Sequence, residues 1–197
     1  MNEELLKQLV WMDYRLAFVI GAIAPLILLI WAVTKKKEAI YKLLIIYWRV
    51  ASLMLIAIYL LVPGWEAGFL SGIGVRILIP LTLWFWVDLN EEIRDYLPSL
   101  LKFVFAAWRW AATIYFTLSA IASFYFIPCG LSGSSANSFC TIWQEVPWAY
   151  RASIHSEPGN AGILGFFGAM GLCFYLLYFV YFLLVRLGKQ GRSALEQ

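Results

Sequence analysis

Five long runs of apolar residues constrain the fold of this chain more than any other feature of its sequence. A helix that crosses a bilayer needs about 20 consecutive, mostly apolar residues. Five stretches meet this requirement, at residues 16–33, 43–62, 67–87, 103–127 and 161–185. Only 14% of the residues are charged, whereas soluble domains carry about 25%. The sequence therefore predicts an all-α, multi-pass membrane protein with a single integral membrane domain over residues 1–197.

The distribution of basic residues predicts how these five spans are oriented. Lysine and arginine near span ends favour the cytoplasmic side of a membrane. One side of the predicted topology carries nine of them: Lys35, Lys36, Lys37, Lys42, Arg94, Lys102, Arg186, Lys189 and Arg192. The other side carries three: Lys7, Arg15 and Arg151. The N-terminal segment MNEELLKQLVWMDYR also lacks the features of a cleaved signal peptide. We therefore expect an N-terminus outside the cytoplasm, or in a lumen, and a cytoplasmic C-terminus.

Two of the three cysteines fall in the predicted extracytoplasmic loop, residues 128–160. Disulfides persist in oxidising compartments such as a periplasm or a lumen. A bond between Cys129 and Cys140 would close the segment CGLSGSSANSFC, which is rich in glycine and serine. We favour this disulfide over two unrelated thiols, and disfavour metal binding because two thiols make an incomplete zinc site. Cys173 lies inside the fifth span and is interpreted as a small packing residue.

Charged residues gather at the predicted cytoplasmic end of the third span. Four carboxylates there share one face of a helix: Asp88, Glu91, Glu92 and Asp95. Arg49 and Arg109 each lie about seven residues inside the second and fourth spans, beside a tryptophan. Their long side chains can extend toward the level of the carboxylates. We favour a structural ion-pair network that ties three spans together. Docking of a partner or a lipid head group, and metal or proton chemistry, are the alternatives.

Arg76 lies near the middle of the third span, at a depth where we expect no acidic residue. A charge at the bilayer centre costs about 3 kcal/mol or more, and it usually faces the protein interior. Pro80 cannot donate to the carbonyl of Arg76, and Ser71, Gly72 and Gly74 allow close backbone approach. We favour backbone carbonyls as the partners of Arg76. A polar cofactor group or the carboxylate of another protein is the alternative.

The fifth span changes character along its length. Its first half carries a stripe of small residues: Ala161, Gly162, Gly165, Gly168 and Ala169. Small residues let membrane helices approach closely, so we expect this half to pack against the protein's own spans. The second half, residues 174–182, is rich in aromatic residues and is interpreted as a lipid-contacting and interfacial surface. Docking of a pigment, a quinone or a partner protein is the alternative for the span.

Several kinds of chemistry have no matching residues in this sequence. His155 is the only histidine and lies in the 128–160 loop, so the predicted spans offer no histidine ligand for haem, copper or di-iron. The sequence also lacks a CxxC pair, a nucleotide-binding loop and a GxSxG nucleophile motif. We therefore expect no enzymatic activity, no metal and no nucleic-acid partner. Binding of pigment or lipid stays open.

Four segments together resemble a known protein family: RLAFVIGAIAPLILLIWAVTKKKEAIYKLLIIYWRVASL, RILIPLTLWFWVDLNEEI, AAWRWAATIY and LYFVYFLLVRLGKQGRSALEQ. The chain resembles, over nearly its whole length, a cyanobacterial family of small multi-pass membrane proteins known only as a domain of unknown function. This resemblance implies a photosynthetic host and a thylakoid or plasma membrane. The family carries no assigned activity, so the resemblance gives no role to any residue.

Two functions are consistent with these observations. The first is a non-enzymatic integral membrane factor that binds, assembles or stabilises a larger membrane complex, such as a photosystem or an electron-transport complex of the thylakoid. The second is a small transporter, channel or membrane enzyme that uses the arginines and carboxylates at the cytoplasmic end. The absence of catalytic motifs favours the first.

Overall fold

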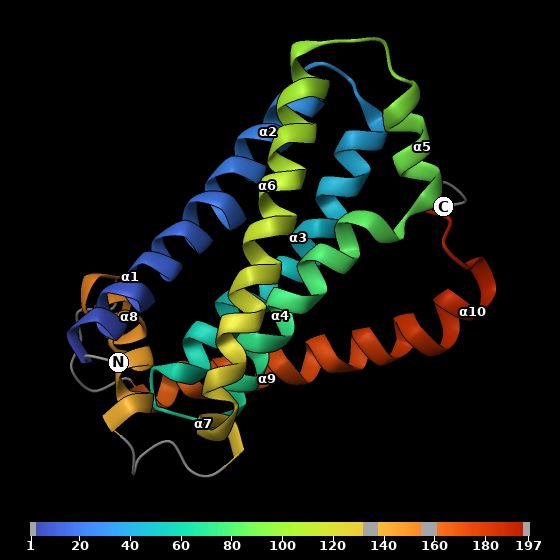
Figure 1. The fold of residues 1–197 in the computed structure, drawn as a ribbon. Coiled ribbons are helices and arrows are strands. Elements are labelled where there is room, and N and C mark those ends of the chain that lie inside the picture. Colours follow the sequence, from blue (N-terminus) through green and yellow to red (C-terminus); the bar gives the residue numbers. More distant parts are fainter. Residues whose placement is uncertain (1–2, 132–137, 155–160, 195–197) are drawn as a thin grey trace.

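The computed structural model describes residues 3–131, 138–154 and 161–194, and these residues are helical except at short connections (Figure 1). Five helical segments are long and apolar enough to cross a membrane: Glu3–Thr34, Glu38–Leu61, Glu66–Phe85, Leu100–Leu131 and Ala161–Lys189. The prediction of an all-α, multi-pass membrane protein with five spans is confirmed.

The first span is longer than the sequence suggested. It is a continuous rod made of α1 (Glu3–Phe18), the π-helical turn η1 (Val19–Ile23) and α2 (Ala24–Thr34). We placed its start at residue 16 because charged residues interrupt the apolar run before that point. The helix continues because α1 buries Leu6 and Val10 in a cluster that includes Trp143 of α8 (Ser138–Ile154). Tertiary contacts therefore stabilise a segment whose own apolar content is low.

Three further helices pack beside α2 to form the core of the bundle. These are α3 (Glu38–Leu61), α4 (Glu66–Phe85) and α6 (Leu100–Ser123). Tyr47, Leu83 and Phe105 lie in this core with no exposed surface. The turn between α3 and α4 contains Gly64 at a φ of +80°, a conformation that glycine adopts without strain.

The chain bends sharply after α4. Trp86 is extended, and the short helix α5 (Val87–Asp95) then continues in a new direction (Figure 1). α5 stays on the bundle because Leu89 and Ile93 are buried in the main core. The acidic residues that followed the third apolar run in the sequence therefore belong to a separate helix.

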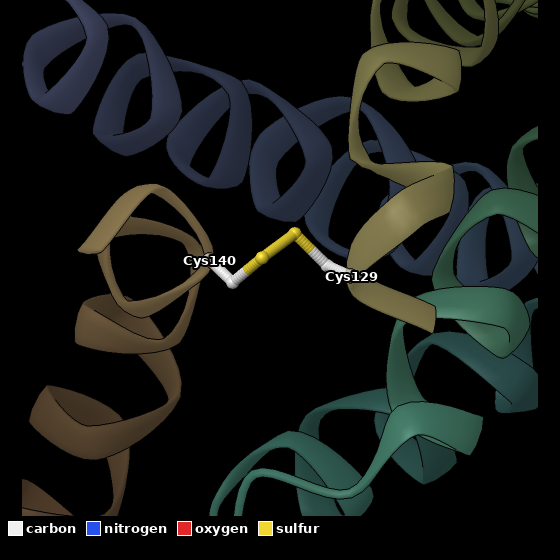
Figure 2. The surroundings of a disulfide bond; sticks show 2 residues. All are labelled: Cys129 and Cys140. Carbon is white, nitrogen blue, oxygen red and sulfur yellow. A yellow bond between two sulfur atoms is a disulfide. The ribbon is translucent and has the colours of Figure 1, made fainter. Parts of the chain in front are cut away.

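The segment between the fourth and fifth spans was predicted as a loop, but its described part is helical. After α6 come the 3₁₀ turn η2 (Phe124–Phe126), α7 (Ile127–Leu131) and α8. Cys129 of α7 and Cys140 of α8 are both buried and form a disulfide, with Cα atoms 5.7 Å apart (Figure 2). The disulfide thus joins α8 to the end of the fourth span. His155 lies outside the residues that the structure describes.

The fifth span runs obliquely across the bundle and leaves it toward its C-terminal end (Figure 1). It consists of α9 (Ala161–Tyr181), the π-helical turn η4 (Phe182–Arg186) and α10 (Leu187–Gln190). Its first half touches α3 and the turn that follows α3 through glycines. A methyl group on Gly165 would lie 2.6 Å from Pro63, and one on Gly168 would lie 3.0 Å from Leu60. These glycines are therefore required for the close approach of the two helices.

Candidate functional site

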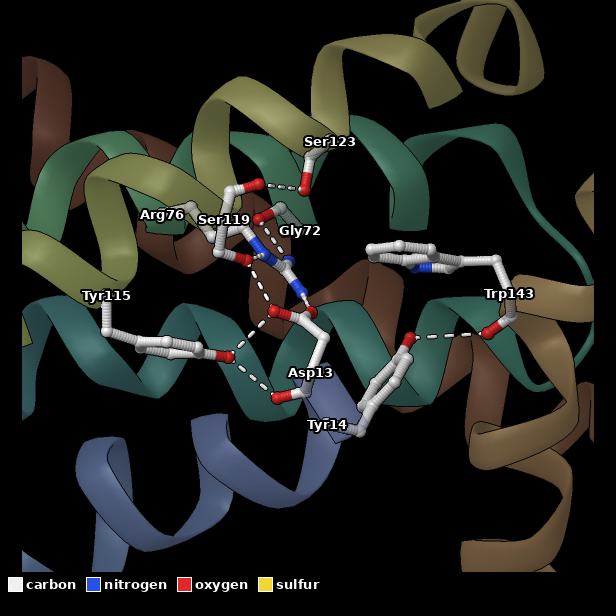
Figure 3. Close-up of polar contacts among 8 residues, drawn as sticks. All are labelled: Asp13, Tyr14, Gly72, Arg76, Tyr115, Ser119, Ser123 and Trp143. Carbon is white, nitrogen blue, oxygen red and sulfur yellow. Dashed lines mark hydrogen bonds and ion pairs between the residues drawn. The ribbon is translucent and has the colours of Figure 1, made fainter. Parts of the chain in front are cut away.

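A buried ion pair joins the first and third spans. Arg76 of α4 donates through Nη2 to Oδ2 of Asp13 in α1 over 2.6 Å (Figure 3). The two side chains are only 8% and 19% exposed. Nε of Arg76 donates to Oγ of Ser119, and Nη1 donates to the carbonyl of Gly72, each over 2.8 Å. The Trp143 ring lies 5.1 Å from the guanidinium, within cation–π range.

The carboxylate of Asp13 is equally well satisfied. Its Oδ1 accepts hydrogen bonds from the hydroxyls of Tyr115 (2.8 Å) and Ser119 (2.6 Å), both on α6 (Figure 3). The Tyr115 hydroxyl also lies 2.6 Å from the backbone carbonyl of Asp13. Every nitrogen of the guanidinium and both carboxylate oxygens thus have partners. A polar network that is completely satisfied fixes the relative positions of α1, α4 and α6.

This network differs from the sequence analysis in one respect, the acidic partner of Arg76, and agrees with it in another, the use of a backbone carbonyl. We expected no acidic residue at the depth of Arg76, and Asp13 is one. It was missed because we began the first span at residue 16, whereas the helix extends back to Glu3. Arg76 does use a backbone carbonyl, but that carbonyl belongs to Gly72 on the preceding turn. The backbone carbonyl of Arg76 itself, four residues before Pro80, is not the acceptor.

The expected ion pairs between Arg49, Arg109 and the carboxylates of α5 do not form. Nη1 of Arg109 donates to Oδ1 of Asn90 over 2.5 Å, and its guanidinium lies 4.1 Å from the Trp84 ring centroid. Arg49 donates to the Tyr178 hydroxyl over 3.3 Å. Within residues 3–131, 138–154 and 161–194, neither arginine pairs with a carboxylate. The bend at Trp86 is the physical reason, because it places the carboxylates on a separate helix, α5, and not on a continuation of α4.

The carboxylates of α5 have local partners instead. Oδ2 of Asp88 accepts from the hydroxyl of Ser193 (2.9 Å) and from the backbone N–H of Ala194 (2.6 Å), so this residue holds the C-terminal tail. Glu92 accepts a 2.9 Å hydrogen bond from the hydroxyl of Tyr96, and burial raises the pKa of that hydroxyl. The two exposed carboxylates, Glu91 and Asp95, each lie 4.0 Å from the guanidinium of Arg94.

A cavity of about 240 Å³ lies between α3, α4 and the second half of the fifth span. We call it the lateral groove. Its lining is apolar or aromatic except for Arg49, Thr82 and Arg186, and two of the aromatic residues, Tyr175 and Tyr178, carry hydroxyl groups. From the sequence, Arg49 and Arg186 are not brought together, because Arg186 counts among the basic residues of the C-terminal tail. One signal in the sequence is Arg186, which follows the aromatic run of residues 174–182 after three aliphatic residues.

The small residues predicted to form the packing face of the fifth span are only partly buried. Gly168 is buried against α3 and Gly165 against the turn that follows α3, whereas Ala161 and Ala169 are partly exposed. No atom would contact a methyl group on Gly162 within 4 Å. Among the residues searched in the described part of the chain, no group of three or more His, Cys, Asp or Glu side chains could hold a metal ion.

Comparison with known proteins identifies one match. A family model described as "Protein of unknown function (DUF3177)" matches residues 7–195, which include every site discussed above. Neither the curated proteins nor the solved structures contain a match to this chain.

Proposed function

This chain belongs to the DUF3177 family of proteins of unknown function, and we propose that it is a non-enzymatic membrane factor that binds, assembles or stabilises a larger membrane complex. The proposed site of action is the thylakoid membrane, and the proposed partner is a photosystem or an electron-transport complex. The resemblance of the sequence to a cyanobacterial family supports this choice of membrane and partner.

The exposure of the fifth span is the observation that carries the proposal. Only 17% of its most apolar window is buried within the protein, compared with 50% for the window of α4. Large apolar side chains cover the exposed faces of α9, including Phe166, Phe167, Phe174 and Leu177. Membrane helices associate through van der Waals packing of such surfaces. The fifth span packs closely on the rest of the protein mainly through its glycines. Most of its surface is therefore available for contact with another membrane protein.

The alternative function has less support from the geometry. A transporter, channel or membrane enzyme of the kind we considered would need the two arginines and the carboxylates of α5 to share one cavity. Arg109 lies against Trp84 and Asn90, whereas Asp88 holds the C-terminal tail. The internal ion pair of Asp13 and Arg76 is fully hydrogen-bonded and serves to join helices. These arrangements favour a protein that acts through its surface.

Site-specific photocrosslinking tests the proposal directly. Cys173 is exposed on α9 and is the only cysteine outside the disulfide. A maleimide photocrosslinker attached to Cys173 in native membranes should capture a subunit of the partner complex, which mass spectrometry then identifies. The matched control carries Cys173→Ser and Leu118→Cys, which moves the probe to an exposed position on α6. We expect the captured subunit from the α9 position and much less of it from the α6 position.

Two results together would overturn the proposal. The first is that the probe at Cys173 captures only lipid, or the same mixture of proteins as the probe on α6. The second is that photosynthetic complexes accumulate normally in membranes that lack the protein.

A further inference from the structure

The lateral groove exists because the two halves of the fifth span pack differently. In the first half, Gly168 and Gly165 allow α9 to touch α3 and the turn that follows it closely. In the second half, bulky residues such as Tyr175, Phe179 and Phe182 replace the glycines and line the groove. The groove opens at the protein surface, because Leu81 in its lining is 59% exposed. A molecule in the surrounding bilayer can therefore reach it from the side.

The charged residues that line the groove are both basic. Arg49 and Arg186 both line it, and no aspartate or glutamate is among its described lining residues. Arg49 donates one 3.3 Å hydrogen bond, to the Tyr178 hydroxyl, and makes no ion pair in the described part of the chain. Arg76, another arginine deep in a span, has a carboxylate, a hydroxyl and a carbonyl as partners. A guanidinium within a membrane segment normally has such partners, so Arg49 retains donors for an anion.

The lateral groove therefore combines guanidinium groups that can bind an anion with an apolar lining. We propose that the lateral groove binds a membrane lipid with an anionic head group, such as phosphatidylglycerol. The phosphate accepts hydrogen bonds from the guanidinium groups, whose planar donors suit phosphate oxygens. Basic pockets between transmembrane helices bind anionic head groups in this way. The first part of an acyl chain lies along the apolar lining between α3, α4 and η4.

The size of the groove sets how much of the lipid it holds. Its volume of about 240 Å³ is smaller than the roughly 300–1,000 Å³ of pockets that enclose a drug-sized ligand. The groove therefore holds the phosphate and the beginning of one chain, while the rest of the lipid stays in the bilayer. A free phosphate ion would not use the apolar lining, and a neutral isoprenoid would not use the two arginines.

Native mass spectrometry of the detergent-purified protein tests this proposal. The protein is mixed with equal amounts of phosphatidylglycerol and the zwitterionic phosphatidylcholine, and the bound lipid is counted for each variant. We expect preferential retention of phosphatidylglycerol by the wild-type protein. Arg49→Gln and Arg186→Gln should each weaken this retention about tenfold, which corresponds to the loss of one charge-assisted hydrogen bond. Arg49→Lys should retain more of the binding than Arg49→Gln does.

Two further variants separate the groove from other basic surfaces. Val50→Phe fills the apolar lining without changing the charge, and it should also reduce lipid retention. Arg15→Gln removes an exposed arginine of α1 outside the groove and should leave retention unchanged. Circular dichroism and thermal unfolding establish that each variant is folded before its lipid binding is compared. Because two different arginines are tested, the loss of one variant to misfolding leaves the other informative.

Three outcomes would overturn the proposal. One is equal retention of phosphatidylcholine and phosphatidylglycerol by the wild-type protein. Another is that Arg15→Gln lowers retention as much as Arg49→Gln does. The third is that a short-chain quinone binds the groove with the same affinity in wild type and Arg49→Gln while phosphatidylglycerol does not bind. The measurement uses isolated protein, so its outcome is independent of whether the chain associates with a photosynthetic complex.

Discussion

The hydroxyl of Tyr47 donates a 2.6 Å hydrogen bond to the backbone carbonyl of Gly21, which lies in the π-helical turn of the first span. In an α-helix this carbonyl would accept from the residue four positions later, but that residue is Pro25, which has no N–H. Trp108 donates in the same way to the neighbouring carbonyl of Ile20, over 2.9 Å. Side chains of α3 and α6 thus supply donors to two carbonyls at the point where Pro25 lacks an N–H and the N–H of Ala24 bonds to Val19 instead.

Tyr47→Phe should destabilise the protein by about 1–2 kcal/mol, because it leaves the Gly21 carbonyl buried without a donor. Thermal unfolding in detergent measures the loss. Adding Pro25→Ala restores a backbone N–H, so the double variant should be closer to wild type than Tyr47→Phe is. Tyr41→Phe, at an exposed tyrosine of the same helix, is the control and should change little. Equal losses from Tyr47→Phe with and without Pro25→Ala would contradict this explanation.

The ion pair of Asp13 and Arg76 should show strong coupling in a double-mutant cycle. Asp13→Asn or Arg76→Met alone leaves a buried group without its partner, which costs about 3–5 kcal/mol. The double variant should lose less than the sum of the two single losses. Lys7→Gln breaks a partly exposed pair with Glu145 on the same end of the protein and should cost about 1 kcal/mol or less. Additive losses from Asp13→Asn and Arg76→Met would show that the two residues act independently.

The sequence predicts the elements of this fold better than the contacts between them. Apolar run length is sufficient to find five spans, because the bilayer imposes a minimum length on each. It does not reveal that Asp13 reaches Arg76, since that contact depends on a helix held by tertiary packing. It also does not reveal which way Arg49 points, because depth along a helix says nothing about rotation around its axis. The bend at Trp86 is a third case, since no proline or glycine marks it.

Removal of the disulfide should destabilise the end of the protein that contains α8. Cys129→Ser or Cys140→Ser opens a short covalent loop, and a loss of about 2–4 kcal/mol is expected. Because α8 carries Trp143, which packs against Arg76, the effect should extend to the buried ion pair. Thermal unfolding with and without a reductant measures the loss. Cys173→Ser is the control, and the reductant should lower the unfolding temperature of this variant as it does that of wild type.

Asp88→Ala should release the C-terminal tail, since it removes the acceptor for Ser193 and for the backbone N–H of Ala194. Each of these hydrogen bonds to a charged group is worth about 1.5–3 kcal/mol, so the released tail should be at least tenfold more populated. Trypsin cleavage after Arg192 reports this population when opening is fast relative to cleavage. Asp95→Ala, at an exposed carboxylate of the same helix, is the control. Unchanged cleavage in Asp88→Ala would show that the tail is held by other contacts.

The two ends of the protein should face opposite sides of the membrane, with α5 in the cytoplasm. The structure places α5 beside the C-terminal tail and α8 beside the N-terminal helix (Figure 1). The surplus of lysine and arginine on the α5 end predicts that this end is cytoplasmic. Leu97→Cys and Ile154→Cys, both at exposed positions and both combined with Cys173→Ser, place one free thiol at each end. In intact bacterial cells that express the protein in the plasma membrane, a membrane-impermeant maleimide should label Ile154→Cys and spare Leu97→Cys until the cells are opened. The reverse labelling pattern would show that the topology is opposite to the one predicted. It would also place the lateral groove, whose Arg186 lies near the C-terminal tail, in the outer leaflet.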